Sequence, residues 1–420
     1  MMRHDTYQRI LDDASRPDPY PLYRELRETP VARQDDGSYV VSTYWEILHL
    51  LHDPRLSSDI RRQAPAGADP RNVEETGLKQ PFLVLDPPEH DRLRRLAMRQ
   101  FGPPSAPCRV TDMTDELAGI VGELLDGLAD RHEADMVDAF SYPFPVTVIC
   151  RLLGVPREDE RQFRQWADVL VASLDPSPSE DPNARLQRRV QASSELSAYL
   201  GELIEEHRGN PGEDMLSGLA TDRGPDGRMR SEDLVATARL LLIAGHETTV
   251  NLISNGMLTL LRHPELLRRM GDEPEFAVRF VEELLRYEPP VQLVPFRTAL
   301  DDIDIGGVTI AAGAPVSLVL ASGNRDPARF RNPERFDPGR EDNQHLGFGS
   351  GVHLCFGAPL ARVEARLALT EFATRLRNPR LAADPPPYRE SPILRGPRHL
   401  PMTFDRVVTH SRGYAASGRR

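Results

Sequence analysis

A long segment with few charges constrains the fold of this chain more than any other feature. Residues 231–263 are rich in Leu, Ile and Val, begin at Ser231 as a candidate N-cap, and are followed by Pro264. At about 1.5 Å per residue, this segment predicts a helix about 45 Å long. A helix that is apolar nearly all round must be buried, so we expect it to run through the core of a helical domain.

Hydrophobic periodicity elsewhere predicts more helix and little sheet. Helices are expected over residues 88–100, 112–130, 158–173, 184–208, 274–287 and 359–376. Short strands are expected over residues 38–42, 308–310 and 315–320, the last two joined by an Ala-Ala-Gly turn at 311–313. The Pro/Ser/Asp-rich stretch 175–183 predicts an exposed loop between two helices, of the kind that can serve as a lid. The predicted class is mainly α with a small β region.

Charge and composition exclude several functions. The 52 basic and 64 acidic side chains give a net charge of −12, which argues against a protein that coats nucleic acid or anionic membrane. The charged N-terminus and the lack of any run of 18 apolar residues predict a cytoplasmic protein without a signal peptide or membrane span. Three cysteines, Cys108, Cys150 and Cys355, are too few for a disulfide framework.

The surroundings of Cys355 set it apart from the other two cysteines. Residues 348–357 read F-G-S-G-V-H-L-C-F-G and precede a helical pattern. The glycines let the backbone approach something flat and bulky, and a helix that begins after a cysteine stabilises its thiolate. An isolated cysteine is more often simply buried, which is what we expect of Cys108 and Cys150. The context of Cys355 instead favours a chemical role.

A polar run, A-G-H-E-T-T at residues 244–249, interrupts the long apolar helix near its midpoint. An unpaired buried Glu247 would cost several kcal/mol, so this side chain needs a partner, a water chain or a function. The local alternative is that Thr248 or Thr249 bonds back to a carbonyl one turn earlier and bends the helix.

The ten residues 348–357 match in full the haem-ligand signature Phe-x-x-Gly-x-His-x-Cys-x-Gly, and the chain resembles a soluble bacterial member of the cytochrome P-450 family. The resemblance implies one catalytic domain over residues 1–420. It has a helix-rich core at about 88–290 and 355–378, and β-rich parts at about 25–60, 295–320 and 380–406. It also implies haem b with Cys355 as the axial thiolate, which favours O–O cleavage. Phe348, Gly349 and Gly357 would contact the haem.

The polar run also matches this family's oxygen-activation motif. The resemblance implies that Ala244 lets the helix approach the haem, that Thr248 hydrogen-bonds dioxygen, and that Glu247 belongs to a proton relay from solvent. Relatives that use peroxide typically lack this acid and alcohol pair, so its presence favours O2 with external electrons.

Two further residue sets follow from the resemblance. Glu283 and Arg286 lie one turn apart; a surface pair of this kind is worth only about 0–1 kcal/mol, but in the family it is a buried brace linked to a later arginine, here Arg335 of N-P-E-R-F. Basic residues from three segments are expected to bind the haem propionates, although each alone is more often a solvated charge. These propionate residues are His90, Arg94, Arg297 and His353.

Substrate contacts implied by the resemblance are almost all apolar, which suits a pocket that positions a hydrophobic molecule by shape. Core packing explains any one of them equally well. Besides Ala244 and Thr248, they are Phe82, Leu83, Val84, Leu85, Val291, Leu293, Val294, Ile393 and Leu394.

Electrons must come from other proteins, because the 420 residues hold no flavin domain and no cysteine set for an iron–sulfur cluster. We expect a small acidic ferredoxin and its NAD(P)H-dependent reductase. Arg92, Arg95 and Arg99 are its candidate docking patch, although solvated helix arginines are an equally good interpretation.

The predicted function is hydroxylation or epoxidation of a hydrophobic small molecule with O2, as a tailoring step of secondary metabolism, with no nucleic acid or membrane as partner. The alternatives are oxidative coupling or ring formation on the same fold and a haem-binding sensor without catalysis.

Overall fold

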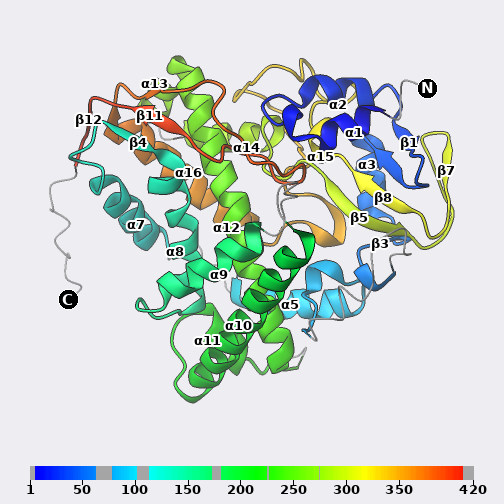
Figure 1. Ribbon diagram of the computed structural model, residues 1–420, viewed down its shortest axis with the longest axis horizontal. Helices are drawn as coiled ribbons and strands as arrows, with labels where there is room; N and C mark the ends of the chain where they lie inside the picture. The colour runs from blue at the N-terminus through cyan, green and yellow to red at the C-terminus, as the bar shows by residue number, and fades with distance from the viewer. Residues whose placement is uncertain are drawn as a thin grey trace.

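The long apolar segment forms the central helix α12, Ser231–Arg262, of a computed structural model. Figure 1 shows α12 crossing the middle of the helical part of the molecule, with the largest sheet to one side. The structure describes residues 5–62, 78–101, 113–172, 181–224, 227–273 and 275–409. The expectation of a buried central helix is confirmed, because most of α12 is shielded from solvent.

Small residues let neighbouring helices approach α12 closely. A Cβ atom on Gly256 would lie 2.6 Å from Leu369 Cδ1 of α16, Ala358–Arg375. A Cβ atom on Gly245 would lie 2.9 Å from Ile149 Cδ1 of α8, Pro143–Leu153. Both distances are too short for carbon–carbon contact, so a larger residue at either position would force Leu369 or Ile149 to move.

The expected helices are present, with ends that differ by a few residues. The other α-helices of the described residues are α1 Asp5–Leu11, α2 Tyr20–Leu26, α3 Tyr44–His52, α5 Glu89–Phe101, α7 Thr114–Asp126, α9 Glu160–Ala172, α10 Pro182–Gly209, α11 Met215–Thr221, α13 Pro264–Asp272, α14 Phe276–Tyr287 and α15 Leu320–Gly323. Most of the loop expected at 175–183 lies outside the described residues, and its last two residues already belong to α10.

Segments far apart in the sequence build the largest sheet. Its strand order is β1 Val31–Arg33, β2 Tyr39–Val41, β8 Pro315–Leu318, β5 Val294–Ala299 and β3 Leu56–Ser57. Only β2 and β8 pair in parallel. A second sheet joins β10 Arg380–Leu381, β11 Pro401–Thr403 and β4 Glu133–Asp135, and β9 Leu376–Arg377 pairs with β12 Arg406–Val407.

The Ala-Ala-Gly turn joins two different sheets. Strand β7, Val308–Ile310, pairs with β6, Ile303–Ile305, whereas β8 pairs with β2 and β5. Strand β8 also ends earlier than expected, at Leu318, because Leu320 begins helix α15. Among the helices in the described part of the chain, none is long and apolar enough to cross a membrane.

A substitution at the contact between α12 and α16 tests this packing. We expect Gly256→Val to lower the free energy of unfolding by about 1–3 kcal/mol, because the new side chain overlaps Leu369. Urea unfolding followed by circular dichroism measures the change. Gly201→Val on α10 is the matched control, because a Cβ atom there meets nothing within 4 Å. Equal stabilities of the two variants would contradict the packing.

Candidate active site

Cys355 lies in the short loop that leads into α16. Its backbone N–H donates to Phe348 O at 2.9 Å, which closes the loop on itself. Burial raises the pKa of the Cys355 thiol, while the backbone N–H groups of Gly357 and Ala358 and the charge of Arg94 act in the opposite direction. The side chain is nevertheless accessible to solvent. Protein therefore surrounds much of this thiol, yet the residue remains accessible to solvent.

Two glycines of this loop have a backbone conformation that other residues rarely adopt. Gly349 and Gly351 have φ angles of 68° and 67°, in the left-handed region. A Cβ atom on Gly351 would also overlap the carbonyl oxygen of Leu51 in α3. The loop therefore packs directly on α3, and its glycines are required by backbone conformation and close contact.

The four basic residues expected to bind propionates come together from three segments. The rings of His90 and His353 have centroids 4.3 Å apart, and Arg94 Nη2 donates to Leu354 O at 2.5 Å. Burial lowers the pKa of His353 to about 3, helped by the nearby His90, Arg297 and Arg94. Burial also lowers the pKa of Arg297 to about 10.

This basic cluster fits an anionic group. Within the described residues, the buried atoms His90 Nε2 and His353 Nδ1 have no hydrogen-bond partner. Buried polar atoms normally have one, and mutually repelling bases are stabilised by an anion. The two carboxylates of a haem complement this arrangement, and the accessible sulfur of Cys355 lies in the same region of the chain.

The midpoint of α12 has an accessible face. Ala244 and Thr248 are half-buried, whereas His246 and Glu247 between them are buried. Thr248 Oγ1 donates to Ala244 O at 2.6 Å, which is the back-bond that the sequence offered as the local alternative. The two positions named for oxygen activation thus share one face of the helix, one turn apart.

Glu247 has an ion-pair partner that the sequence analysis missed. Arg389 Nε lies 2.6 Å from Glu247 Oε1, and Asn251 Nδ2 donates to the same oxygen at 3.1 Å. The Glu247 side chain is 1% exposed and that of Arg389 is 9% exposed. Arg389 belongs to the C-terminal segment, far from Glu247 in the sequence, and no motif around it indicates this contact.

The Glu283–Arg286 pair is a buried brace. Both side chains are 0% exposed, and Arg286 Nη2 and Nε lie 2.7 and 2.8 Å from the two oxygens of Glu283. Arg286 also donates to the carbonyl oxygens of Asn324, Pro333 and Arg335 at 2.9–3.0 Å. This pair therefore fixes the loop that contains residues 332–340.

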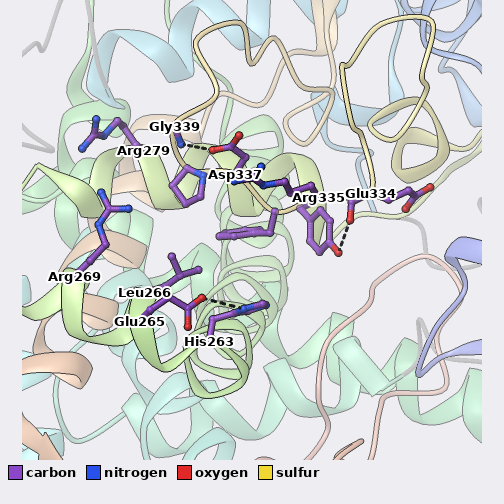
Figure 2. Close-up of a pocket in the computed structure, with 12 residues that line it drawn as sticks. His263, Glu265, Leu266, Arg269, Arg279, Glu334, Arg335, Asp337 and Gly339 are labelled. Carbon is purple, nitrogen blue, oxygen red and sulfur yellow. Dashed lines mark hydrogen bonds and ion pairs between the residues drawn. The ribbon is translucent and has the colours of Figure 1, made fainter.

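The arginine that completes the brace is Arg340, and the expected role of the Arg335 side chain is not seen. Arg340 Nε lies 3.3 Å from Glu283 Oε2, whereas Arg335 contributes only its backbone carbonyl. Figure 2 shows Arg335 on the loop beside a surface pocket of about 650 Å³, which the loop forms with α13 and α14. Arg340, five residues after Arg335 in the same loop, is the arginine that contacts Glu283. Because both residues are arginines, the sequence does not reveal which of them makes this contact.

Helix α14 also holds the segment that leads to Cys355. Glu282 pairs with Arg362 at 2.6 Å and with His345 at 3.2 Å. Burial raises the pKa of Glu282, but the hydrogen bonds and charges of His345 and Arg362 outweigh this effect and lower the pKa to about 2. The guanidinium of Arg362 lies 4.6 Å from the ring centre of Phe348. A Cβ atom on Gly347 would lie 2.5 Å from the Leu285 carbonyl. The brace and the cysteine loop thus share one support.

The residues expected to contact substrate differ in how deeply they are buried. Phe82 is 2% exposed and packs against the rings of Phe356 and His90, with centroids 5.4 and 6.1 Å away. Val291 pairs with Leu394 in an isolated β-bridge, which brings two of the expected segments together. Leu85 and Leu293 are buried, Leu83 is exposed, and Val84, Val294 and Ile393 are half-buried. The sequence indicated only that these residues are apolar, whereas the structure shows that they differ in exposure to solvent.

The remaining cysteines differ from Cys355. Cys150 is buried in the main hydrophobic core, and burial raises the pKa of its thiol to about 12. Cys108 lies outside the described residues.

Two arginines of one loop test which of them completes the brace. We expect Arg340→Gln to lower the free energy of unfolding by about 1.5–3 kcal/mol, because it removes a charged hydrogen bond from the buried Glu283. Arg335→Gln should change it by less than about 0.5 kcal/mol, because the side chain is exposed and the carbonyl stays. Denaturant unfolding of the two variants measures both changes. A larger loss of unfolding free energy in Arg335→Gln than in Arg340→Gln would contradict the assignment of Arg340 to the brace.

Comparison with known proteins agrees with this geometry. The family model described as Cytochrome P450 matches residues 48–398. Cytochrome P450 monooxygenase PikC of Streptomyces venezuelae is 40% identical over 405 residues, which cover 93% of this chain and 92% of that protein. Vitamin D(3) 25-hydroxylase of Pseudonocardia autotrophica is 40% identical over 397 residues, covering 92% and 94%.

A solved structure shares the architecture. Cytochrome P450 CYP109Q5 from Chondromyces apiculatus superposes with a TM-score of 0.85 at 33% identity, covering 96% of this chain and 98% of that one. Members of the matched family are oxidoreductases with cysteine-ligated haem iron, and Cys355 is the cysteine of the haem-ligand signature. On the family match, the sequence identity and the shared fold, this chain belongs to the cytochrome P450 family.

Proposed function

We propose that this monooxygenase hydroxylates or epoxidises a hydrophobic small molecule, as a tailoring step of secondary metabolism, with electrons from a ferredoxin and its reductase. The observation that carries the proposal is the accessible face of α12, where Ala244 and Thr248 are half-buried near the midpoint of a mostly buried helix. A helix face of this kind offers room for a ligand and one hydroxyl to orient it.

The proposed roles of the side chains follow from their contacts. Haem bound through Cys355 supplies the activation of dioxygen. His90, Arg94, Arg297 and His353 hold its carboxylates, as their clustering and the low pKa of His353 favour. Thr248 presents its hydroxyl, which the Ala244 carbonyl orients, and Glu247 supplies protons to it from the buried side of the helix.

The substrate class rests on apolar chemistry. The bridge between Val291 and Leu394 joins two segments whose other candidate contacts are Leu293, Val294 and Ile393, all hydrocarbon side chains. A surface made of such hydrocarbon side chains recognises a hydrophobic molecule by its shape. The name of one relative, vitamin D(3) 25-hydroxylase, specifies a hydrophobic substrate, which supports the proposal for this chain.

A pair of threonines on α12 tests the oxygen-activation role. The substrate is first chosen from hydrophobic compounds by the shift of the ferric haem absorbance, and turnover under ¹⁸O2 should place one labelled atom in the product. We expect Thr248→Val to lower product formed per electron pair consumed about tenfold or more, because it removes the hydroxyl that transfers protons.

Thr259→Val is the control for that variant. Thr259 also bonds back to a carbonyl four residues earlier, at 2.7 Å, but lies further along α12. Its substitution should leave the yield per electron pair unchanged. Unlabelled product, or equal yields from both variants, would contradict the proposed function.

Ferredoxin docking is proposed to centre on Arg95. Of the three arginines of the expected docking patch, Arg92 and Arg99 are half-buried. Arg95 is exposed on the same helix, α5, as the propionate-binding residues His90 and Arg94. An exposed cation near the haem-binding residues suits an acidic electron donor.

Charge reversal tests the docking proposal. We expect Arg95→Glu to lower ferredoxin-supported turnover several-fold at low ionic strength, and the loss should shrink as salt screens the interaction. Arg33→Glu, at an exposed position on β1, is the matched control and should have no effect. Unchanged low-salt turnover of Arg95→Glu would refute the docking site.

A further inference from the structure

The C-terminal turn of residues 388–397 packs along one face of α12. Glu247, Asn251 and Asn255 are spaced four residues apart and so share a face. Asn255 Nδ2 donates to the carbonyl oxygen of Arg395 at 3.1 Å. Because a Cβ atom on Gly396 would overlap the Asn251 amide, only glycine permits this approach.

The same turn places Arg389 opposite Glu247. The backbone N–H of Arg389 donates to Gly396 O at 3.2 Å, and Tyr388 forms a bridge with Pro397. Arg389 is therefore part of a short hairpin whose other strand touches Asn251. Its guanidinium reaches Glu247, where Nε and Oε1 are 2.6 Å apart. Backbone pairing thus fixes the main chain at Arg389 relative to α12.

A second buried glutamate, which has no arginine in contact among the described residues, shows the effect of burial on the pKa. Glu364 of α16 is 2% exposed, and burial raises its pKa well above the ordinary value despite a hydrogen bond with Thr249. Burial of this degree favours a neutral carboxyl group. Glu247 is buried as deeply, but it has a guanidinium in contact.

The neighbouring histidine does not supply the balancing charge. His246 is fully buried against the ring of Tyr142, with centroids 4.6 Å apart. Burial, with Arg389 and Arg164 nearby, lowers the pKa of His246 to about 3, so its imidazole is neutral at physiological pH. The guanidinium of Arg389 is a positive charge in contact with Glu247.

We infer that Arg389 is a positioning residue for the monooxygenase reaction: it holds the buried Glu247 carboxylate ionised and turned toward the C-terminal turn. An ionised carboxylate accepts a proton from water and passes it to the hydroxyl of Thr248, whereas a neutral buried carboxyl group has no vacant site for that proton. The functional part of this inference rests on the proposed function; the protonation state of Glu247 does not.

Infrared spectroscopy of the haem-loaded protein tests the protonation state directly. The C=O stretch of a protonated carboxyl group, identified by its shift in D2O, is recorded at pH 7 for the wild type and for Arg389→Met. Both spectra are repeated in a Glu247→Gln background to assign any band to Glu247. Arg389→Gln, which keeps a hydrogen-bond donor, replaces Arg389→Met if the latter fails to fold, and Glu364→Gln identifies the band of Glu364.

We expect a new protonated-carboxyl band in Arg389→Met that is absent from the wild type and from Arg389→Met/Glu247→Gln. Arg389→Lys keeps the positive charge and should show no such band. Arg398→Met is the control on the same segment, because Arg398 is 49% exposed and contacts the exposed Asp138. A Glu247 that stays ionised in Arg389→Met, or is already protonated in the wild type, would overturn the inference.

Product yield per electron pair supplies the functional test. Arg389→Met should lower the yield about tenfold in the wild-type background and should add no further loss to Glu247→Gln, because both changes act through one carboxylate. Arg389→Lys should restore most of the yield. A full additional loss in the Glu247→Gln background would show that Arg389 acts on another group. Because the infrared band reports only the protonation state of Glu247, it tests that part of the inference even if the proposed function fails.

Discussion

The buried ion pair of Glu283 and Arg286 is the interaction on which the site depends. Two fully buried charges persist only when each is paired and hydrogen-bonded, and here three backbone carbonyls, Arg340 and the backbone N–H of Asp337 complete the set. Because the same helix, α14, also anchors Arg362 through Glu282, the loop that presents Cys355 is tied to this brace. The cysteine is thus accessible on a loop that these contacts support.

Helix α12 combines two requirements that usually conflict. Its glycines allow close packing against α8 and α16, which buries the helix. At its midpoint it exposes Ala244 and Thr248 on one side, and on the other it meets the C-terminal turn through Glu247 and Asn251. This one helix thereby places an alcohol on its accessible face and an acid in a buried environment that holds an arginine.

Much of this was predictable, because the informative patterns are local. The apolar run predicted α12, and the cysteine motif and the resemblance that it carries indicated the basic residues around His90 and His353 that the fold brings together. The contacts of Arg340 and Arg389 were not predictable, because they depend on which of several arginines the folded chain brings to a buried acid. The pairing of β8 with β2 and β5, instead of with β7, likewise depends on strands distant in sequence.

The absorbance spectrum of the reduced protein under carbon monoxide tests the central claim, that Cys355 is the thiolate that binds haem. We predict the long-wavelength Soret band typical of thiolate ligation in the wild type. In Cys355→His, which offers a nitrogen ligand, the band should move to the shorter wavelength of histidine-ligated haem. A wild-type protein that binds no haem, or a Cys355→His protein that retains the long-wavelength band, would contradict the account.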